Sequence, residues 1–354
     1  MLALWSPVTP RMPGQPQGPG DPAPETSTTI LYLVDPAGVR YPITTVASAA
    51  GLRLAAWSGD GRRALLVANA VVPSAAVSVD LHTGTQTTIP VAGYPRFTNP
   101  DGTALLVSTE FNGNRPGTLK RVDLTGSEQL TYPTDRLGGA GQFSGGYLES
   151  PDGTQLVLGT ANLGNEVLPR KDNSLVVIGN DGTILRTLPA PMPNALCRPV
   201  RWWTPTVMLT HCTKEGSSAS QLWEVPLDGG SPTALTAVNS GQQDDPGFAG
   251  IDDGIAWKLP SGTYLESAGA CGTMFLSRLT PDGHTTRVHI DDVSGGAFTV
   301  GVAGDTLVLR SQVGCGGSSA LLRYDPSTNV STVLLGPPVT GGAITDALLY
   351  PGRD

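Results

Sequence analysis

Short apolar runs recur along the chain, and each is bounded by a polar turn rich in Gly, Asp, Asn and Pro. The pattern is clearest at residues 97–109, where the turn Asn99-Pro100-Asp101-Gly102 precedes the apolar run from Ala104 to Val107. This turn chemistry is specific, because Pro fixes φ, Asp hydrogen-bonds its own backbone and Gly adopts positive φ. Short runs of β-forming residues between such turns are typical of buried strands, and no run has convincing helical spacing. We therefore predict an all-β fold.

The predicted strands pair into two kinds of hairpin that alternate along the chain, here called inner and outer. Inner hairpins are expected at 54–69, 97–109, 147–160, 197–212, 248–259, 299–311 and, in a short form, 342–351. Outer hairpins, built on turns rich in Asp, Asn and Gly, are expected at 30–44, 76–90, 118–131, 174–188, 221–235, 274–289 and 320–334. The outer turns recur about every 48 residues, within the roughly 20–50 residues that mark repeat architectures. One hairpin of each kind makes a four-stranded antiparallel sheet, which is the blade of a β-propeller.

The order of the hairpins predicts how the ring closes. The chain starts with an outer hairpin and ends with an inner one, so hairpin 30–44 should pair with hairpin 342–351 and hide both edges. The turn of hairpin 248–259 is placed at Asp252-Asp253-Gly254, and that of hairpin 342–351 at Thr345-Asp346. The prediction is a seven-bladed β-propeller over residues 28–354, after a Pro/Gly-rich disordered linker or stem over residues 1–27. Because the last hairpin is short, six blades with a loose end is the alternative.

The turn motifs carry a family resemblance. Trp57-Ser58-Gly59-Asp60-Gly61 and Glu149-Ser150-Pro151-Asp152-Gly153 are each followed by an apolar strand. They resemble the WD40-like repeat, of the PD40 type, in TolB and in the propellers of prolyl oligopeptidases. The resemblance spans residues 28–351 and implies the propeller fold without implying an activity, because propellers host many chemistries. TolB has six blades, whereas seven are predicted here. TolB also has a helical N-terminal domain, whereas no helical segment is predicted in this sequence.

Charge and hydropathy exclude several classes of partner. The net charge is −8 and no basic cluster is present, which argues against nucleic acid and against an anionic membrane surface. No apolar stretch approaches the roughly 20 residues of a membrane helix, so we expect no membrane insertion within this chain. The apolar residues Met1 to Trp5 are shorter than the core of a signal peptide. They fit either the tail of an export or anchor segment, with a tether upstream of residue 1, or an ordinary N-terminus.

The four cysteines predict two disulfides. Cys197 and Cys212 lie at equal distances from the turn Thr204-Pro205, so they should face each other directly across a hairpin. Cys271 and Cys315 occupy equivalent positions in the inner-to-outer connections of adjacent blades. We predict the bridges 197–212 and 271–315 and hence an extracytoplasmic location, secreted, periplasmic or tethered to a membrane. Four buried free thiols are the alternative.

Loop lengths predict which face of the propeller binds. Turns within hairpins are short and connections between hairpins are long, and in a propeller the two lie on opposite faces. Long loops on a rigid scaffold usually carry function, although neutral drift in loop length is the simpler explanation. The candidate ligand-binding residues at the long loops are Tyr94, Arg96, Asp135, Arg136, Tyr147, Glu166, Arg170, Asp244 and Asp245. Asp244 and Asp245 are also the candidate site for Ca²⁺, the one cofactor that the sequence suggests.

No catalytic motif is present in the sequence. There is no G-x-S-x-G elbow, no Lys followed by Ser or Thr, and no H-E-x-x-H, although carboxylates from distant blades can still pair at a site. We therefore assign no catalytic residue. The sequence predicts a non-catalytic, monomeric propeller that binds a protein, peptide or glycan partner on its long-loop face. The alternatives are a propeller enzyme, such as a metal-dependent lactonase with acidic ligands at the axis, and the sensor domain of a larger membrane protein.

Overall fold

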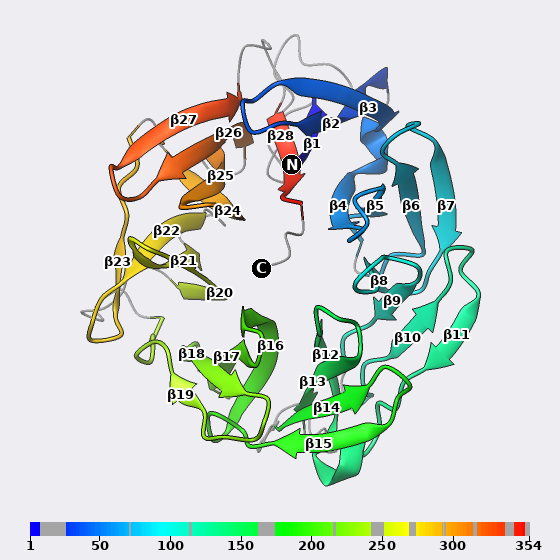
Figure 1. Cartoon of the computed structure of the whole chain (residues 1–354), viewed down its shortest axis with the longest axis vertical. Coiled ribbons are helices and arrows are strands. Elements are labelled where there is room, and N and C mark those ends of the chain that lie inside the picture. Colours follow the sequence, from blue (N-terminus) through cyan, green and yellow to red (C-terminus); the bar gives the residue numbers. More distant parts are fainter. Residues whose placement is uncertain are drawn as a thin grey trace.

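The chain forms a ring of seven four-stranded antiparallel sheets (Figure 1). The computed structural model describes residues 1–7, 26–70, 72–112, 115–161, 174–214, 217–241, 251–268, 274–291, 293, 295–313, 317–336 and 343–350. Within these ranges the chain is nearly all β, with two short 3₁₀ segments at η2 (Ser48–Ala50) and η3 (Leu137–Gly139). The predicted seven-bladed propeller is therefore confirmed, and the six-bladed alternative is wrong.

Six blades are built from consecutive strands that run outward from the axis, and we number them I to VI (Figure 1). Blades I to III contain β4 (Leu52–Trp57), β5 (Arg63–Ala68), β6 (Ala75–Asp80), β7 (Gln86–Pro90), β8 (Tyr94–Phe97), β9 (Leu105–Ser108), β10 (Leu119–Val122), β11 (Glu128–Thr131), β12 (Gln142–Glu149), β13 (Gln155–Ala161), β14 (Leu175–Gly179) and β15 (Ile184–Leu188). Blades IV to VI contain β16 (Ala195–Thr204), β17 (Val207–Lys214), β18 (Ser220–Pro226), β19 (Thr233–Ala234), β20 (Ile251–Leu259), β21 (Gly262–Ala268), β22 (Met274–Leu279), β23 (Thr285–Arg287), β24 (Gly296–Ala303), β25 (Thr306–Val313), β26 (Gly317–Asp325) and β27 (Val330–Leu335).

The seventh, closing blade joins the two ends of the chain. Its strands, from the axis outward, are β28 (Ala343–Leu348), β1 (Leu2–Ser6), β2 (Thr28–Val34) and β3 (Arg40–Ala47). Closure by both ends is confirmed, but the predicted direct pairing of 30–44 with 342–351 is wrong, because β1 lies between them. The predicted turn at Thr345-Asp346 is also wrong, because β28 passes through both residues as a single strand that pairs with β1. The linker prediction is also wrong for Leu2–Ser6, while residues 8–25 lie outside the described residues. The physical reason is burial: Leu2, Ala3 and Leu4 are fully inaccessible to solvent. Burying these apolar side chains in a central strand lowers the free energy relative to leaving them in an exposed linker.

A second correction concerns blade V. Strand β20 runs straight through Asp252-Asp253-Gly254, where the sequence predicted a turn, and its turn lies instead at Pro260-Ser261. The pairing register shifts between Asp252 and Ala256, so the Asp-Gly segment forms a bulge and not a turn. Ala256 and Trp257 then pair with Leu265 and Tyr264 and are buried, which favours this register.

The repeat motif works through local hydrogen bonds in the inner turns. The Ser150 hydroxyl donates to Asp152 Oδ1 over 2.6 Å and accepts the Gln155 N–H over 3.1 Å. The equivalent bonds join Ser58, Asp60 and Arg63 in blade I, at 2.6 and 2.9 Å. The Ser150 hydroxyl holds the pKa of Asp152 below its ordinary value, so the turn keeps its charged acceptor at neutral pH.

Both faces of each blade are buried against its neighbours. One apolar cluster, for example, joins Leu4 and Leu31 of the closing blade to Leu54 and Leu66 of blade I.

The ring of blades has two open faces, one at each end of its axis. We call the end with the turns inside hairpins the turn face, and the end with the connections between hairpins the loop face. Within the described ranges, no helix is long and apolar enough to cross a membrane.

Candidate functional site

The inner strands of four neighbouring blades enclose a cavity of about 280 Å³ at the turn face, which we call the axial cavity. Its apolar wall includes Trp57, Phe97, Leu106, Tyr147, Leu148 and Leu348, and its polar lining includes Arg96, Asn99 and Glu149. The volume lies just below the roughly 300–1,000 Å³ of common small-molecule pockets. A single amino-acid side chain or a comparably small molecule fits a space of this size.

Equivalent positions of the repeat supply three of the lining residues. Trp57, Phe97 and Glu149 each stand directly before the Ser or Thr that begins an inner turn. Two blades therefore place an aromatic ring at the cavity, and blade III places a carboxyl group there. The sequence analysis missed Glu149 as a site residue, although an acid in place of the aromatic residue of this motif was a visible signal.

Neighbouring blades fix Glu149 from both sides. Its side chain is 7% exposed, and Oε2 accepts the backbone N–H of Asn99 from blade II over 2.7 Å. Its backbone carbonyl accepts the indole N–H of Trp202 from blade IV over 2.8 Å. The second carboxyl oxygen, Oε1, is buried and has no hydrogen-bond partner among the described residues. A buried polar atom left in this state costs about 1–3 kcal/mol, so Oε1 is suited to accept a bond from a ligand.

Burial also changes the protonation of this group. Loss of hydration raises the pKa of Glu149 to about 7, and the nearby charge of Asp152 acts in the same direction. The Asn99 N–H and the charge of Arg121 oppose the shift. The carboxyl of Glu149 is therefore divided between its acid and its carboxylate near neutral pH.

Two other buried carboxyl groups show what Glu149 shares with the rest of the ring. Asp346 accepts the N–H of Leu54 through Oδ2 and that of Ala347 through Oδ1, both over 2.9 Å. Glu266 accepts the N–H of Thr299 through Oε2. All three acids thus clamp the backbone of a neighbouring inner strand. Asp346 uses both carboxyl oxygens inside the protein, whereas Glu149 holds Asn99 with one oxygen and lines the cavity.

Two residues predicted from the sequence meet at this cavity. The guanidinium carbon of Arg96 lies 6.0 Å from the ring centroid of Tyr147, within cation–π range. Arg96 is exposed, whereas Tyr147 is buried and donates to the carbonyl of Leu106 over 3.5 Å. Burial raises the pKa of Tyr147 to about 12, although Arg96 acts in the opposite direction, so the phenol stays protonated. The cavity therefore combines an exposed positive charge with a buried aromatic wall.

Their location corrects the sequence analysis. Arg96 and Tyr147 were placed on the loop face because they follow long connections, yet they line a cavity at the turn face. Tyr147 is the sixth residue of β12, and a strand advances about 3.3 Å per residue, so it lies well away from the loop that precedes it. Proximity to a loop in sequence was therefore a poor guide to the face.

The other predicted site residues do not line the axial cavity. Tyr94 begins β8 at the loop face, where the guanidinium carbon of Arg53 lies 5.9 Å from its ring centroid. Asp135 accepts a bond from Gln142 over 3.2 Å, and Arg136 precedes η3 with φ of 56°. Both are exposed on the connection between blades II and III. Glu166, Arg170, Asp244 and Asp245 lie outside the described residues.

A second hollow lies beside the axial cavity, between blades II and III. This lateral cleft of about 710 Å³ is lined by Arg121, Asp152 and Asn180, and it shares Asn99 with the axial cavity. Asn180 Oδ1 accepts bonds from Arg121 Nη1 and from the Tyr132 hydroxyl, each over 3.0 Å. These bonds fix Arg121 beside Glu149, where its charge lowers the pKa of the carboxyl.

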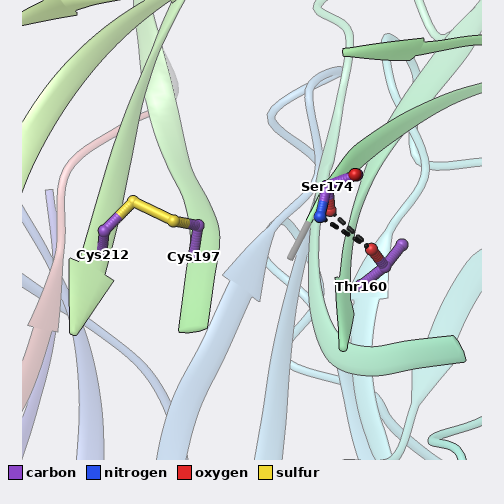
Figure 2. Close-up of a disulfide and its surroundings, with 4 residues drawn as sticks. All are labelled: Thr160, Ser174, Cys197 and Cys212. Atoms are coloured by element: carbon purple, nitrogen blue, oxygen red, sulfur yellow. Dashed lines mark hydrogen bonds between the residues drawn. A yellow bond between two sulfur atoms is a disulfide. The ribbon is translucent and has the colours of Figure 1, made fainter. Parts of the chain in front are cut away.

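The disulfide between Cys197 and Cys212 is confirmed. These residues pair directly across β16 and β17, with Cα atoms 4.0 Å apart, and both are fully buried (Figure 2). Figure 2 also shows Thr160 of blade III, which bonds Ser174 beside the bridge. Cys271 and Cys315 lie outside the described residues, so their bridge stays a prediction.

In the part of the chain that the structure describes, no group of three or more His, Cys, Asp or Glu side chains lies close enough to hold a metal ion. The predicted Ca²⁺ site at Asp244 and Asp245 falls outside that part.

Comparisons with known proteins support the fold alone. No protein-family model and no curated protein sequence matches this chain. Among solved structures, dihydro-heme d1 dehydrogenase NirN in complex with DHE is 16% identical, with 95% of this chain and 69% of that chain covered and a TM-score of 0.54. The β-propeller domain of the Trilobed protease from Pyrococcus furiosus is 13% identical, with coverages of 94% and 98% and a TM-score of 0.52.

A TolB-like structure is also among the matches. The putative TolB from Agrobacterium tumefaciens is 15% identical, with coverages of 90% and 91% and a TM-score of 0.44. The propeller fold that the predicted resemblance implied is confirmed by the ring of seven four-stranded sheets and by the similarity to the Pyrococcus β-propeller domain. The Pyrococcus domain is described as having an open velcro topology, whereas here β28 pairs with β1 and closes the ring.

Proposed function

We propose that this protein is a binding protein, acting outside the cytoplasm as a monomer, whose peptide or protein partner inserts one residue into the axial cavity. The observation that carries the proposal is the convergence of Arg96, Tyr147 and Glu149 at one small cavity with aromatic and aliphatic walls. A pocket that is mainly apolar and contains a few converging polar groups is the usual form of a binding site.

The size and chemistry of the cavity favour a peptide or protein over a glycan. A cavity of about 280 Å³ accepts one side chain, and interfaces typically gain most of their energy from a few anchors buried in such pockets. Exposed Arg96 at the same site can pair with a carbonyl or carboxylate beside the anchor. The surrounding turn face would supply the rest of the contact area.

The location outside the cytoplasm rests on the disulfide. A buried bridge between Cys197 and Cys212 is favoured in an oxidising compartment and is rare in the cytosol. Binding through the loop face remains a separate prediction from the sequence, because four of the nine residues that suggested it lie outside the described ranges.

The test begins with a phage-displayed random peptide library selected on the immobilised, disulfide-bonded protein. We expect the selected peptides to bind Arg96→Ala at least about tenfold more weakly than the wild type, because the variant loses a charge at the cavity. The matched control is Arg40→Ala, an exposed arginine on the outer strand β3, which should bind normally. If Arg136→Ala weakens binding while Arg96→Ala does not, the partner belongs on the loop face and the axial-cavity proposal fails.

A further inference from the structure

We infer that the residue inserted into the axial cavity carries a positively charged nitrogen, a lysine side chain or a free N-terminus, that pairs with the carboxylate of Glu149. This inference rests on the proposed function, since it names the chemistry of the partner at the same site. It goes further by assigning the bond to one oxygen atom of one residue.

The argument starts from the state of the two carboxyl oxygens. Oε2 already accepts the Asn99 N–H, whereas Oε1 is buried without a partner in the described part of the chain. Because Glu149 lines the cavity, a ligand group there can supply the donor that Oε1 lacks, and a charged donor forms a bond roughly twice as strong as a neutral one. The ligand group that best satisfies Oε1 is therefore an N–H donor that carries positive charge.

The clamp between blades does not need this second oxygen. Glu266 makes the same kind of contact to Thr299 between blades V and VI, and Asp346 makes it to Leu54 between the closing blade and blade I. Of the three acids, Glu149 is the one that lines the axial cavity. The bond from the Asn99 N–H to Oε2 accounts for an acid at this position, and we assign Oε1 to the ligand.

The cavity wall fits an ammonium group on an apolar stem. Trp57, Phe97 and Tyr147 supply aromatic rings, which attract cations through their faces, and Leu148 and Leu348 supply aliphatic surface. A lysine side chain has four methylene groups that such a wall can cover. The guanidinium of Arg96 repels the ammonium only weakly because it is exposed to solvent, and it can donate hydrogen bonds to carbonyl groups of the partner.

The charges around Glu149 decide how binding should depend on pH. Arg121 of β10 and the Asn99 N–H favour the carboxylate, whereas burial and Asp152 favour the protonated acid, and the pKa of Glu149 is about 7. An ammonium ligand binds only the carboxylate, so its affinity should rise as the pH increases through 7. A ligand that accepts a bond from protonated Glu149 would show the opposite trend.

The probe is benzylammonium, compared with its neutral analogue benzyl alcohol, in titrations followed by calorimetry or NMR. We expect wild-type protein to bind benzylammonium at least about tenfold more tightly than benzyl alcohol at pH 8, with the preference shrinking toward pH 6. Glu149→Gln should abolish the preference, because the amide keeps the shape and removes the charge. The matched control is Glu266→Gln, which changes the same kind of clamp and should leave the preference intact.

Several results would overturn the inference. They are equal binding of the two probes by the wild type, no detectable binding of benzylammonium, an affinity that rises toward acid pH, and a preference that survives Glu149→Gln. The wild-type pH series needs no variant, so it decides the matter even if a substitution disturbs folding. Library peptides that depend on Arg96 but ignore Glu149→Gln would keep the proposed function and reject this inference. Peptides that ignore both substitutions would reject the proposed function.

Discussion

In blades I to III, the residue directly before the inner turn lines the axial cavity. Trp57 and Phe97 occupy this position in blades I and II, and Glu149 occupies it in blade III. The turn that follows is built from the same Ser-to-Asp hydrogen bond in blades I and III. The motif therefore preserves the backbone while the preceding side chain is left to vary, and this variation creates a polar site in an apolar ring.

The buried carboxyl of Glu149 should make the fold less stable at alkaline pH. Its pKa rises from 4.5 to about 7 on folding, so the native state binds more protons than the unfolded state between these values. Stability contributed by the protonated form is full below pH 4.5 and is lost as the pH rises through 7, with a difference of at most about 3 kcal/mol. The acid is therefore retained at the expense of stability near and above neutral pH.

We predict that Glu149→Gln raises the urea midpoint of unfolding at pH 8 and leaves it unchanged at pH 4. The amide oxygen still accepts the Asn99 N–H, and the variant removes only the buried charge. The control is Glu128→Gln, since Lys120 and Thr131 lower the pKa of this exposed carboxyl and its loss should give no gain at pH 8. A lower midpoint for Glu149→Gln at pH 8 would show that the charged form is stabilising.

At the scale of elements, strand pairing brings distant cysteines into bonding distance. The disulfide closes a hairpin whose cysteines are 15 residues apart, and a bridge of this span contributes about 3 kcal/mol in the chain-entropy model. Both sulfurs lie in the packed core of blade IV with Ala195, so their loss also leaves space unfilled.

We predict that replacing Cys197 and Cys212 together by Ala lowers the free energy of unfolding by about 2–4 kcal/mol. Urea unfolding of the wild type, with and without a reductant, provides the comparison. Non-reducing peptide mapping tests both predicted bridges. A Cys212–Cys271 linkage, or four free thiols, would contradict the pairing and remove the support for an oxidising compartment.

At the scale of the whole molecule, the ring is held shut by a six-residue stretch at each end of the described chain. Strand β1 pairs with β28 on one side and with β2 on the other, and its Leu2 and Leu4 join the core shared with blade I. Each blade packs both faces against neighbours, so an open closing blade exposes apolar surface and two strand edges.

We predict that removing residues 343–354, or residues 1–6, lowers the thermal midpoint and causes aggregation. Removing residues 1–6 loses the burial of Leu2, Ala3 and Leu4, and removing residues 343–354 loses that of Ile344. The two truncations therefore test the contributions of β1 and β28 to closure separately. Light scattering during thermal unfolding records both effects. Removing six residues from within 8–25 serves as the control, because the linker prediction expects no change there. A truncated chain that melts like the intact one would refute the closure.

The sequence by itself determined most of the hairpins and the number of blades. Turns are formed by residues a few positions apart, as in the hydrogen bonds of Ser150 with Asp152 and Gln155. A short segment of the sequence is therefore enough to predict them. The repeat of these stretches then determined a propeller, because alternating hairpins bury their faces only when the blades stack in a ring. The pairing of Cys197 with Cys212 was also predicted from the sequence, although the turn lies one residue later than expected and two register shifts between the turn and the cysteines restore the predicted pairing.

Only the tertiary structure decided where β1 goes, where the β20 hairpin turns and which residues meet at the cavity. Leu2 pairs with Leu348, Asp346 bonds Leu54 across 292 positions, and Glu149 bonds Asn99 across 50. These contacts depend on the closed ring, and the free energy that selects them comes from apolar surface shared between blades. That free energy depends on residues from several blades, so no short sequence pattern predicts it. A short apolar segment was therefore predicted to be part of a linker and an Asp-Gly bulge to be a turn, and the position of Glu149 at the cavity became visible only in the assembled ring.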